Sequence, residues 1–225
     1  MLLLPKSTEF NRRIPKQKFY ENLSVTLELK RAFVEQISMI YWRNKLAAST
    51  LNVGPGENVT ELEIFEIKLN QPNLDLKILQ LIDKEVPYHI LYLLEYNGEY
   101  QSWIGYKEPS LAKAGTFKVD SYYHTEWLSL DKLPIRLDGL HMDAIYDNFI
   151  RQVAGERLRF DGNNELGAKS SIKDAIDRDN MRLKLNKQID ALEGKMKNEK
   201  QFNIKVKLNS ELKLLKNNWR SSCEA

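Results

Sequence analysis

The chain has 225 residues, of which 42% are hydrophobic and 29% charged, and its formal net charge is +3. This composition is typical of a soluble globular protein and excludes a fully disordered chain. The apolar start, Met1 to Leu4, is broken by Pro5 and is far too short for a signal peptide or a membrane span. The single Cys223 excludes an internal disulfide and a cysteine metal cluster. We therefore expect a cytoplasmic protein with one domain of about 150 residues and an appendage.

Charge is unevenly distributed along the chain. Residues 1–45 carry nine Lys/Arg against four Asp/Glu, and residues 46–160 carry eleven against seventeen. Residues 181–220 again carry eleven against four. Both ends are thus basic, which suits contact with nucleic acid but also suits solvated helix faces.

The first segment, residues 1–22, contains two prolines and a cluster of four basic residues. This pattern indicates an extended basic arm lying on the surface. The basic residues of the arm are our candidate nucleic-acid contacts: Arg12, Arg13, Lys16 and Lys18.

A helix, two strands and a second helix are expected next. Apolar residues recur at helical spacing over residues 25–40, with Asn22 or Ser24 available as a cap. Residues 39–46 and 62–69 have the composition of strands, joined through the loop at residues 54–56. Asn73 is placed to cap a short helix that ends before Pro87.

The dipeptide Asn97-Gly98 predicts a β-hairpin between residues 88–96 and 99–107, because it accepts positive φ at both centres of a type I′ turn. A two-residue loop also fixes the register, pairing Tyr96 with Glu99. Alternating residues over 116–127 then indicate an edge-ward strand, and apolar spacing over 142–153 indicates a helix with Asp138 near its start.

These elements predict an α/β (α+β-like) domain over residues 23–160, with a mixed sheet of about five strands and flanking helices. The Gly- and Asn-containing residues 161–171 have the composition of a linker. Residues 172–225 form a basic tail that we expect to be helical or coiled coil, as one long helix or a helical pair.

An apolar stripe in the tail predicts a protein interface. Its first half keeps heptad spacing, the pattern slips near Glu199, and a second half follows. Neither half can bury its stripe alone, so the tail must pack on the domain, on a second copy or on another protein. The candidate partner-binding residues are Leu185, Ile189, Leu192, Met196, Phe202 and Val206.

One triplet carries a catalytic alternative. Glu66-Ile67-Lys68 is an E-x-K sequence in a strand, so both charged side chains point to one face. Metal-dependent nucleases use this arrangement to hold Mg²⁺ and to orient water, together with a second acid for which Glu63 is a candidate. The strand at residues 39–46 offers no such acid. We favour a cross-strand ion pair as the role of the triplet.

Other residue patterns indicate structure rather than chemistry. His89, His124 and His141 are too scattered to indicate a metal site, and the aromatic residues of the strands are better explained as core than as a base-stacking surface. No glycine-rich phosphate loop or nucleophile elbow is present in the sequence. The aromatic residues are Tyr41, Trp42, Tyr92, Trp103, Tyr122, Tyr123 and Trp127.

Short segments throughout the chain resemble a bacterial and archaeal family known as domain of unknown function 4391. They include residues 4–8, 14–16, 65–69, 82–88, 199–203 and 208–209, with Trp42, Lys45-Leu46 and Ser49-Thr50. The resemblance implies a genomic context and no established catalytic site. It implies that genes of this family are neighbours of DNA methyltransferase and helicase genes in restriction-like or anti-phage clusters.

Two hypotheses follow. The first is a non-enzymatic adaptor subunit of a DNA-directed restriction-modification or anti-phage assembly, without a cofactor. Its tail would bind a protein such as a DNA methyltransferase or helicase subunit, or a second copy, and its basic residues would contact nucleic acid nonspecifically. The alternative is an Mg²⁺-dependent nuclease that uses Glu66 and Lys68.

Overall fold

The computed structural model describes residues 2–21, 25–109, 117–158 and 171–224, with the backbone alone for Pro109 and residues 220–224. The chain divides into two compact units, Met1–Gly155 and Glu156–Ala225. The predicted caps Asn22 and Ser24 and residues 161–170 of the predicted linker lie outside the described residues.

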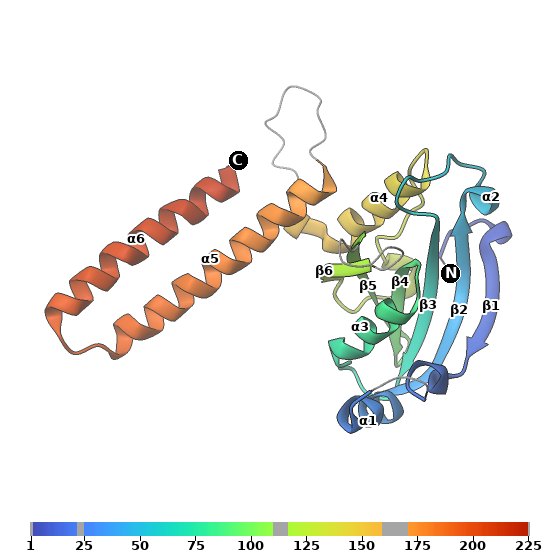
Figure 1. The fold of residues 1–225 in the computed structure, drawn as a ribbon, viewed down its shortest axis with the longest axis horizontal. Coiled ribbons are helices and arrows are strands. Elements are labelled where there is room, and N and C mark those ends of the chain that lie inside the picture. Colours follow the sequence, from blue (N-terminus) through green and yellow to red (C-terminus); the bar gives the residue numbers. More distant parts are fainter. Residues whose placement is uncertain (1, 22–24, 110–116, 159–170, 225) are drawn as a thin grey trace. The chain divides into compact units, whose positions relative to one another are not determined.

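A six-stranded sheet forms the centre of the first unit, in the order β1-β2-β3-β4-β5-β6 (Figure 1). The strands β3 and β4 are parallel and every other neighbouring pair is antiparallel, which confirms a mixed sheet. The strands are β1 (Glu9–Ile14), β2 (Ile37–Ala47), β3 (Glu61–Leu69), β4 (His89–Tyr96), β5 (Glu99–Pro109) and β6 (Phe117–His124).

The strand that the sequence did not predict is β1, within the expected N-terminal arm. It pairs antiparallel with β2, and Arg13 lies opposite Tyr41. The arm is extended, as expected, but it is an edge strand of the sheet rather than a segment lying on its surface. Its residues are mostly exposed and polar, so they lack the alternating apolar pattern by which a half-buried strand is recognised.

Among its described residues, the first unit has four α-helices. They are α1 (Leu27–Gln36), α2 (Ala48–Leu51), α3 (Leu76–Glu85) and α4 (Met142–Ala154), with short 3-10 helices at Lys6–Thr8, Lys16–Phe19 and Leu130–Lys132. The helix predicted over residues 25–40 is shorter than expected, because the β-branched Ile37 already belongs to β2.

The helix caps differ from the predictions by a few residues. The side chain of Thr26 accepts a hydrogen bond from Leu29 N at the start of α1, and the Asp75 side chain accepts one from Lys77 N at the start of α3. Asp75, not Asn73, is therefore the cap of α3. At α4 the capping side chain is His141, and Asp138 precedes the start of the helix, as the sequence indicated. Each segment offered several residues able to cap, so the sequence alone did not decide between them.

The predicted hairpin is confirmed in position and in register. Asn97 and Gly98 both have positive φ, at 51° and 84°, as a type I′ turn requires. Tyr96 pairs with Glu99, and the register continues to Leu91 opposite Ile104. The side chains of β4 are consequently buried on both faces of the sheet from His89 to Leu94.

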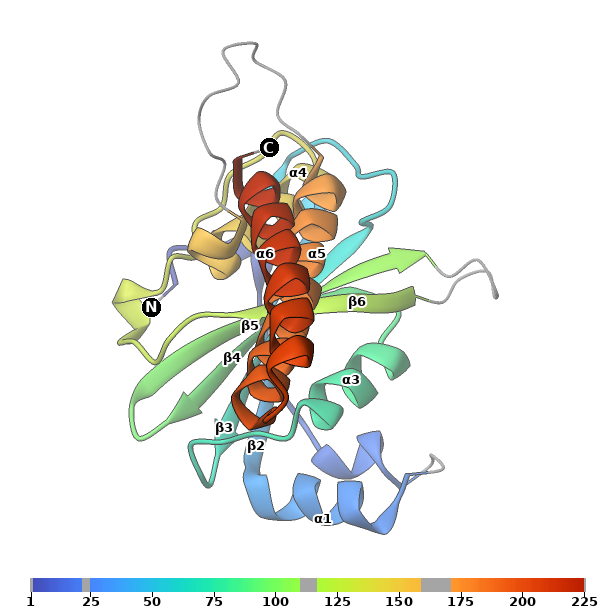
Figure 2. The same ribbon diagram turned by 90° about the vertical axis from the view of Figure 1, so that its left-hand side faces the viewer.

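Helices cover both faces of the sheet. On one face α1 and α3 pack over the strands, and on the other face α4 contacts β3, β5 and β6 (Figure 2). The core under α1 and α3 is built from Phe33, Ile37, Ile40, Phe65, Ile67, Ile78, Ile82, Ile90, Tyr92 and their neighbours.

The second unit is a helical hairpin. The helices α5 (Ile172–Asn198) and α6 (Phe202–Glu224) run antiparallel and side by side, after a short 3-10 helix at Gly155–Leu158 (Figures 1 and 2). The slip near Glu199 is thus a turn between two helices. The Glu199 carboxylate accepts hydrogen bonds from Lys200 N and Gln201 N there. No helix within the described ranges is long and apolar enough to cross a membrane.

Candidate functional site

The E-x-K triplet lies on β3, and Glu66 is held by an arginine. Arg43 donates two hydrogen bonds to it, from Nε to Oε2 and from Nη2 to Oε1, each 2.9 Å long. A bulge in β2 between Trp42 and Asn44 places Arg43 for this fork. The bond to Glu66 raises the pKa of Arg43. Lys68 lies 3.8 Å from the carboxylate of Glu95 on β4.

Glu63 is not brought together with Glu66. The two are three positions apart along β3, so they lie on opposite faces of the sheet. Glu63 is 1% exposed and its Oε2 accepts a 2.6 Å hydrogen bond from Trp42 Nε1. Burial raises its pKa to about 7. Across the described segments no three His, Cys, Asp or Glu side chains are grouped so that they could hold a metal ion. The triplet therefore has the geometry of cross-strand ion pairs.

The four predicted nucleic-acid contacts have different environments. Arg12, Arg13 and Lys18 are exposed, and the Arg12 guanidinium lies 4.5 Å from the centre of the Phe10 ring. Lys16 instead donates to the backbone carbonyls of Val34 (3.1 Å) and Ile37 (2.6 Å), where α1 ends. Burial lowers the pKa of Lys16. Lys16 thus stabilises a helix end, while the other three remain available to solvent.

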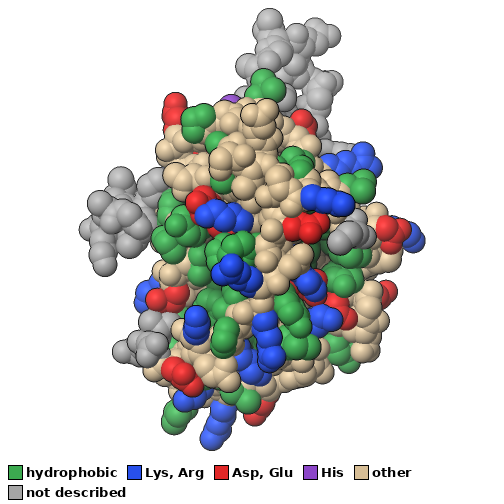
Figure 3. Space-filling view, turned by 90° about the vertical axis from the view of Figure 1, so that its right-hand side faces the viewer, with side chains coloured by type: hydrophobic (Ala, Val, Ile, Leu, Met, Phe, Trp, Pro, Cys, Tyr) green, Lys and Arg blue, Asp and Glu red, His purple; other side chains and the backbone are tan. Residues whose placement is uncertain are grey.

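Figure 3 shows the side of the molecule that lies at the right of Figure 1, where β1 and β2 are found. Lys and Arg side chains gather in the lower half of this view, interspersed with hydrophobic ones and a few acidic ones. This side of the molecule is thus basic and partly apolar in its lower half.

Most of the predicted partner-binding stripe faces the inside of the helical hairpin. Leu185 is buried, and Ile189, Leu192 and Met196 are half-buried on the same face of α5. Met196 borders a hollow together with Phe202 and other residues of α6, so this face of α5 points toward α6. The buried Leu212 belongs to α6. Of the six predicted residues, only Phe202 and Val206 are exposed.

Two hollows flank the seam between α5 and α6 near the turn, each of about 610 Å³. The first, the Phe202 groove, has apolar side chains from Met196, Phe202 and Val206 and a polar rim that includes Glu193, Lys197 and Lys205.

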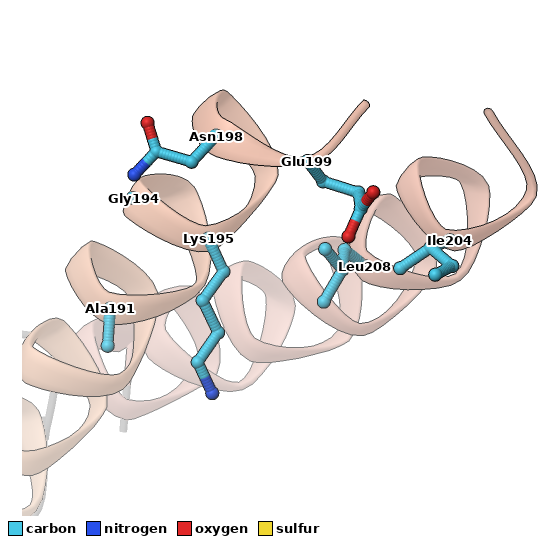
Figure 4. A pocket seen from close by; sticks show the side chains of 7 residues that line it. All are labelled: Ala191, Gly194, Lys195, Asn198, Glu199, Ile204 and Leu208. Carbon is cyan, nitrogen blue, oxygen red and sulfur yellow. The ribbon is translucent and has the colours of Figure 1, made fainter. Parts of the chain in front are cut away.

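The second hollow, the Ala191 groove, lies between small residues of α5 and apolar residues of α6. Figure 4 shows Ala191 and Gly194 on α5 and Ile204 and Leu208 on α6 on either side of it, with Lys195 alongside. In this groove α5 contributes the small residues Ala191 and Gly194 together with the longer Lys195, whereas the Phe202 groove presents a large aromatic ring.

A buried ion pair that the sequence analysis did not identify lies between α3 and β5. Lys107 Nζ is 3.0 Å from Asp83 Oδ1, and both side chains are 1% exposed. The same ammonium donates to the backbone carbonyls of Asp83 (3.2 Å), Val86 (3.3 Å) and Tyr88 (2.5 Å), which lie at the end of α3 and in the connection to β4. Burial raises the pKa of Asp83 and lowers that of Lys107, and their mutual attraction opposes both shifts.

Tyr122 completes this cluster from β6. Its hydroxyl donates a 2.5 Å hydrogen bond to Asp83 Oδ2, and burial together with the neighbouring carboxylate raises its pKa. The ring needs a glycine at position 105, because a Cβ there would lie 2.9 Å from Tyr122 and from Val119. Four oxygen acceptors surround the Lys107 ammonium, so its hydrogen-bonding groups have partners within the cluster. We therefore assign the cluster a structural role. No spacing rule connects Asp83 with Lys107, and the sequence therefore gave no signal for it.

His89 is a structural residue, as expected. Its ring lies against those of Phe117 and Tyr146, with centroids 5.1 and 4.3 Å away. Burial lowers the pKa of His89 to about 4, and the nearby Lys107 charge acts in the same direction. Most of the aromatic residues singled out in the sequence are likewise buried or half-buried in the core of the sheet domain.

Comparison with known proteins gives one match. Residues 2–218 match the family model described as Domain of unknown function (DUF4391). The chain belongs to this family. No curated protein and no solved structure matches the DUF4391 chain. The match extends over α5 and most of α6, so the helical hairpin of this chain lies within the matched region.

Proposed function

We propose that this DUF4391 protein is a non-enzymatic adaptor subunit that binds a partner protein through its α5–α6 hairpin. The observation that carries the proposal is the exposure of large apolar side chains on the hairpin. Phe202 is 77% exposed, Leu214 65% and Val206 50%, although the hairpin already buries a seam of its own. Fully burying each would contribute roughly 1.5 to 3 kcal/mol, which favours a surface that is covered in use.

The cytoplasmic, DNA-directed setting of the proposal rests on the family. The family resemblance implies that DUF4391 genes lie beside DNA methyltransferase and helicase genes. We therefore propose that the partner is a DNA methyltransferase or helicase subunit of a restriction-modification-like or anti-phage assembly. The exposed Arg12, Arg13 and Lys18 would add nonspecific contacts with phosphates. The nuclease alternative has less support, because Mg²⁺ would have to displace Arg43 from both oxygens of Glu66.

Co-expression tests the adaptor function. The chain is produced together with a DNA methyltransferase subunit and a helicase subunit of the proposed assembly, and complex formation is followed by size-exclusion chromatography. We expect Phe202→Asp/Val206→Asp to abolish the complex, because two charges would enter an apolar contact. Asn203→Asp/Asn218→Asp is the matched control, since it adds the same charge to exposed positions of α6 outside the groove. A complex that survives the first double substitution would contradict the proposal.

A further inference from the structure

The Phe202 groove has the form of a site for a helix. Phe202 and Val206 are one turn apart on α6, and Met196 of α5 lies beside them. Together they form a short apolar ridge and hollow along the helix axis. Amphipathic helices bind in such grooves, inserting apolar side chains at spacings of three and four residues.

The charges at the rim select the occupant. Glu193 is already compensated, because its Oε1 lies 2.7 Å from Lys216 Nζ. Lys197 and Lys205 are exposed, and neither makes an ion pair with any described residue. The uncompensated charge of the groove is therefore positive. An acidic surface on the occupant would be attracted to it, and a basic one repelled.

A second copy of this chain fits the groove poorly. In a two-fold pair the same patch meets itself, so Lys197 and Lys205 would face a second set of lysines. The rest of the hairpin adds to the repulsion, since residues 181–220 carry eleven Lys/Arg against four Asp/Glu. We propose that the Phe202 groove binds an acidic amphipathic helix of the partner protein. This inference rests on the adaptor function and specifies the chemistry of the partner.

Two synthetic helical peptides test the inference on the full chain. Both carry leucines at a and d positions; one has Glu and the other Lys at the flanking positions, and binding is measured by fluorescence anisotropy at low and high salt. We expect the Glu peptide to bind with salt-sensitive affinity and the Lys peptide not to bind. Lys197→Glu/Lys205→Glu should weaken the binding of the Glu peptide roughly tenfold or more and should allow the Lys peptide to bind.

The matched control is Lys187→Glu/Lys207→Glu, which changes the net charge equally at exposed positions that do not border the groove. An equal loss of affinity for the Glu peptide in this control would show that the peptide is attracted by the positive charge of the whole hairpin. That result would overturn the groove assignment. Binding of both peptides alike, or of neither, would also overturn it. Self-association of the wild-type chain that Phe202→Asp/Val206→Asp abolishes would identify a second copy as the occupant.

The outcomes separate this inference from the adaptor function. If the Glu peptide fails to bind while the co-expressed complex still depends on Phe202 and Val206, the adaptor function is supported. The inference that the occupant is an acidic helix is then wrong. If the peptide binds as expected but no complex depends on these residues, the groove is a helix site and the proposed partner is wrong.

Discussion

Glu63 is the carboxylate whose ionisation depends most clearly on the fold. Its side chain is 1% exposed, and burial raises its pKa from 4.5 to about 7. The folded state therefore binds this proton more tightly than the unfolded chain. The resulting stabilisation is complete below pH 4.5 and is lost as pH rises toward 7. His89 acts in the opposite direction, because burial lowers its pKa to about 4 and its contribution is lost as pH falls below 6.5.

Replacing Glu63 by Gln should reveal how much Glu63 contributes to the pH dependence of stability. The variant keeps an acceptor for Trp42 but no longer ionises at position 63. Since wild type loses stability there as pH rises, the free energy of unfolding of the variant minus that of wild type should increase by on the order of 3 kcal/mol between pH 4.5 and 8. Urea unfolding at several pH values measures the difference. Glu99→Gln, at an exposed position of the β-hairpin, serves as the control. A difference that stays constant with pH would contradict this prediction, because it would show that folding does not change the pKa of Glu63.

Two lysines show why residue roles were harder to predict than elements. Lys16 binds the terminal carbonyls of α1, and Lys107 binds those at the end of α3. Each lies in a different element from the helix that it stabilises, 18 to 24 residues away in the sequence. A local pattern cannot reveal such a pairing, which depends on the sheet bringing the two segments together. Lys16 was consequently grouped with the exposed basic residues.

At the scale of elements, turn chemistry and hydrophobic periodicity were sufficient for most of the fold. The Asn97-Gly98 turn predicts its hairpin because its dihedral angles are intrinsic to those two residues. The strand β1 was missed because an edge strand buries little and needs no apolar alternation. The heptad stripe of α5 was recognised, but periodicity cannot say whether the covering helix comes from the same chain.

The α5 stripe and the Phe202 groove should respond differently to substitution. Ile189→Asp/Leu192→Asp places charges in the seam between α5 and α6, where burial of each apolar side chain is worth up to roughly 1.5 to 3 kcal/mol. We expect loss of helical circular dichroism and of amide protection in both helices, because neither can bury its stripe alone. Phe202→Asp/Val206→Asp should leave this protection unchanged.

Hydrogen exchange also reports on the division into two units. The amides of β3 and β4 should keep their protection in the Ile189→Asp/Leu192→Asp variant, because the core cluster under α1 and α3 is built from residues of Met1–Gly155. If protection in the sheet falls together with that in α5 and α6, the two units unfold as one and the hairpin is part of the folding core.

At the scale of the whole molecule, the charge distribution predicts nonspecific DNA binding at low salt. Arg12 and Arg13 are exposed on the edge strand β1. Each arginine that contacts a phosphate releases condensed counterions, so the slope of log K against log salt is about −0.9 per contact. Double-stranded DNA binding should therefore be measurable at low salt and should weaken steeply as salt rises.

Arg12→Ala/Arg13→Ala should weaken this binding for all sequences alike and make the salt slope shallower by about two. Lys132→Ala/Arg136→Ala is the matched control, because it removes two exposed positive charges from the same unit, away from β1. Filter binding of a random duplex over a salt series measures both slopes. If the two variants give the same slope, binding follows net charge and not the β1 edge. If wild type retains no DNA at low salt, the prediction of direct DNA binding is wrong.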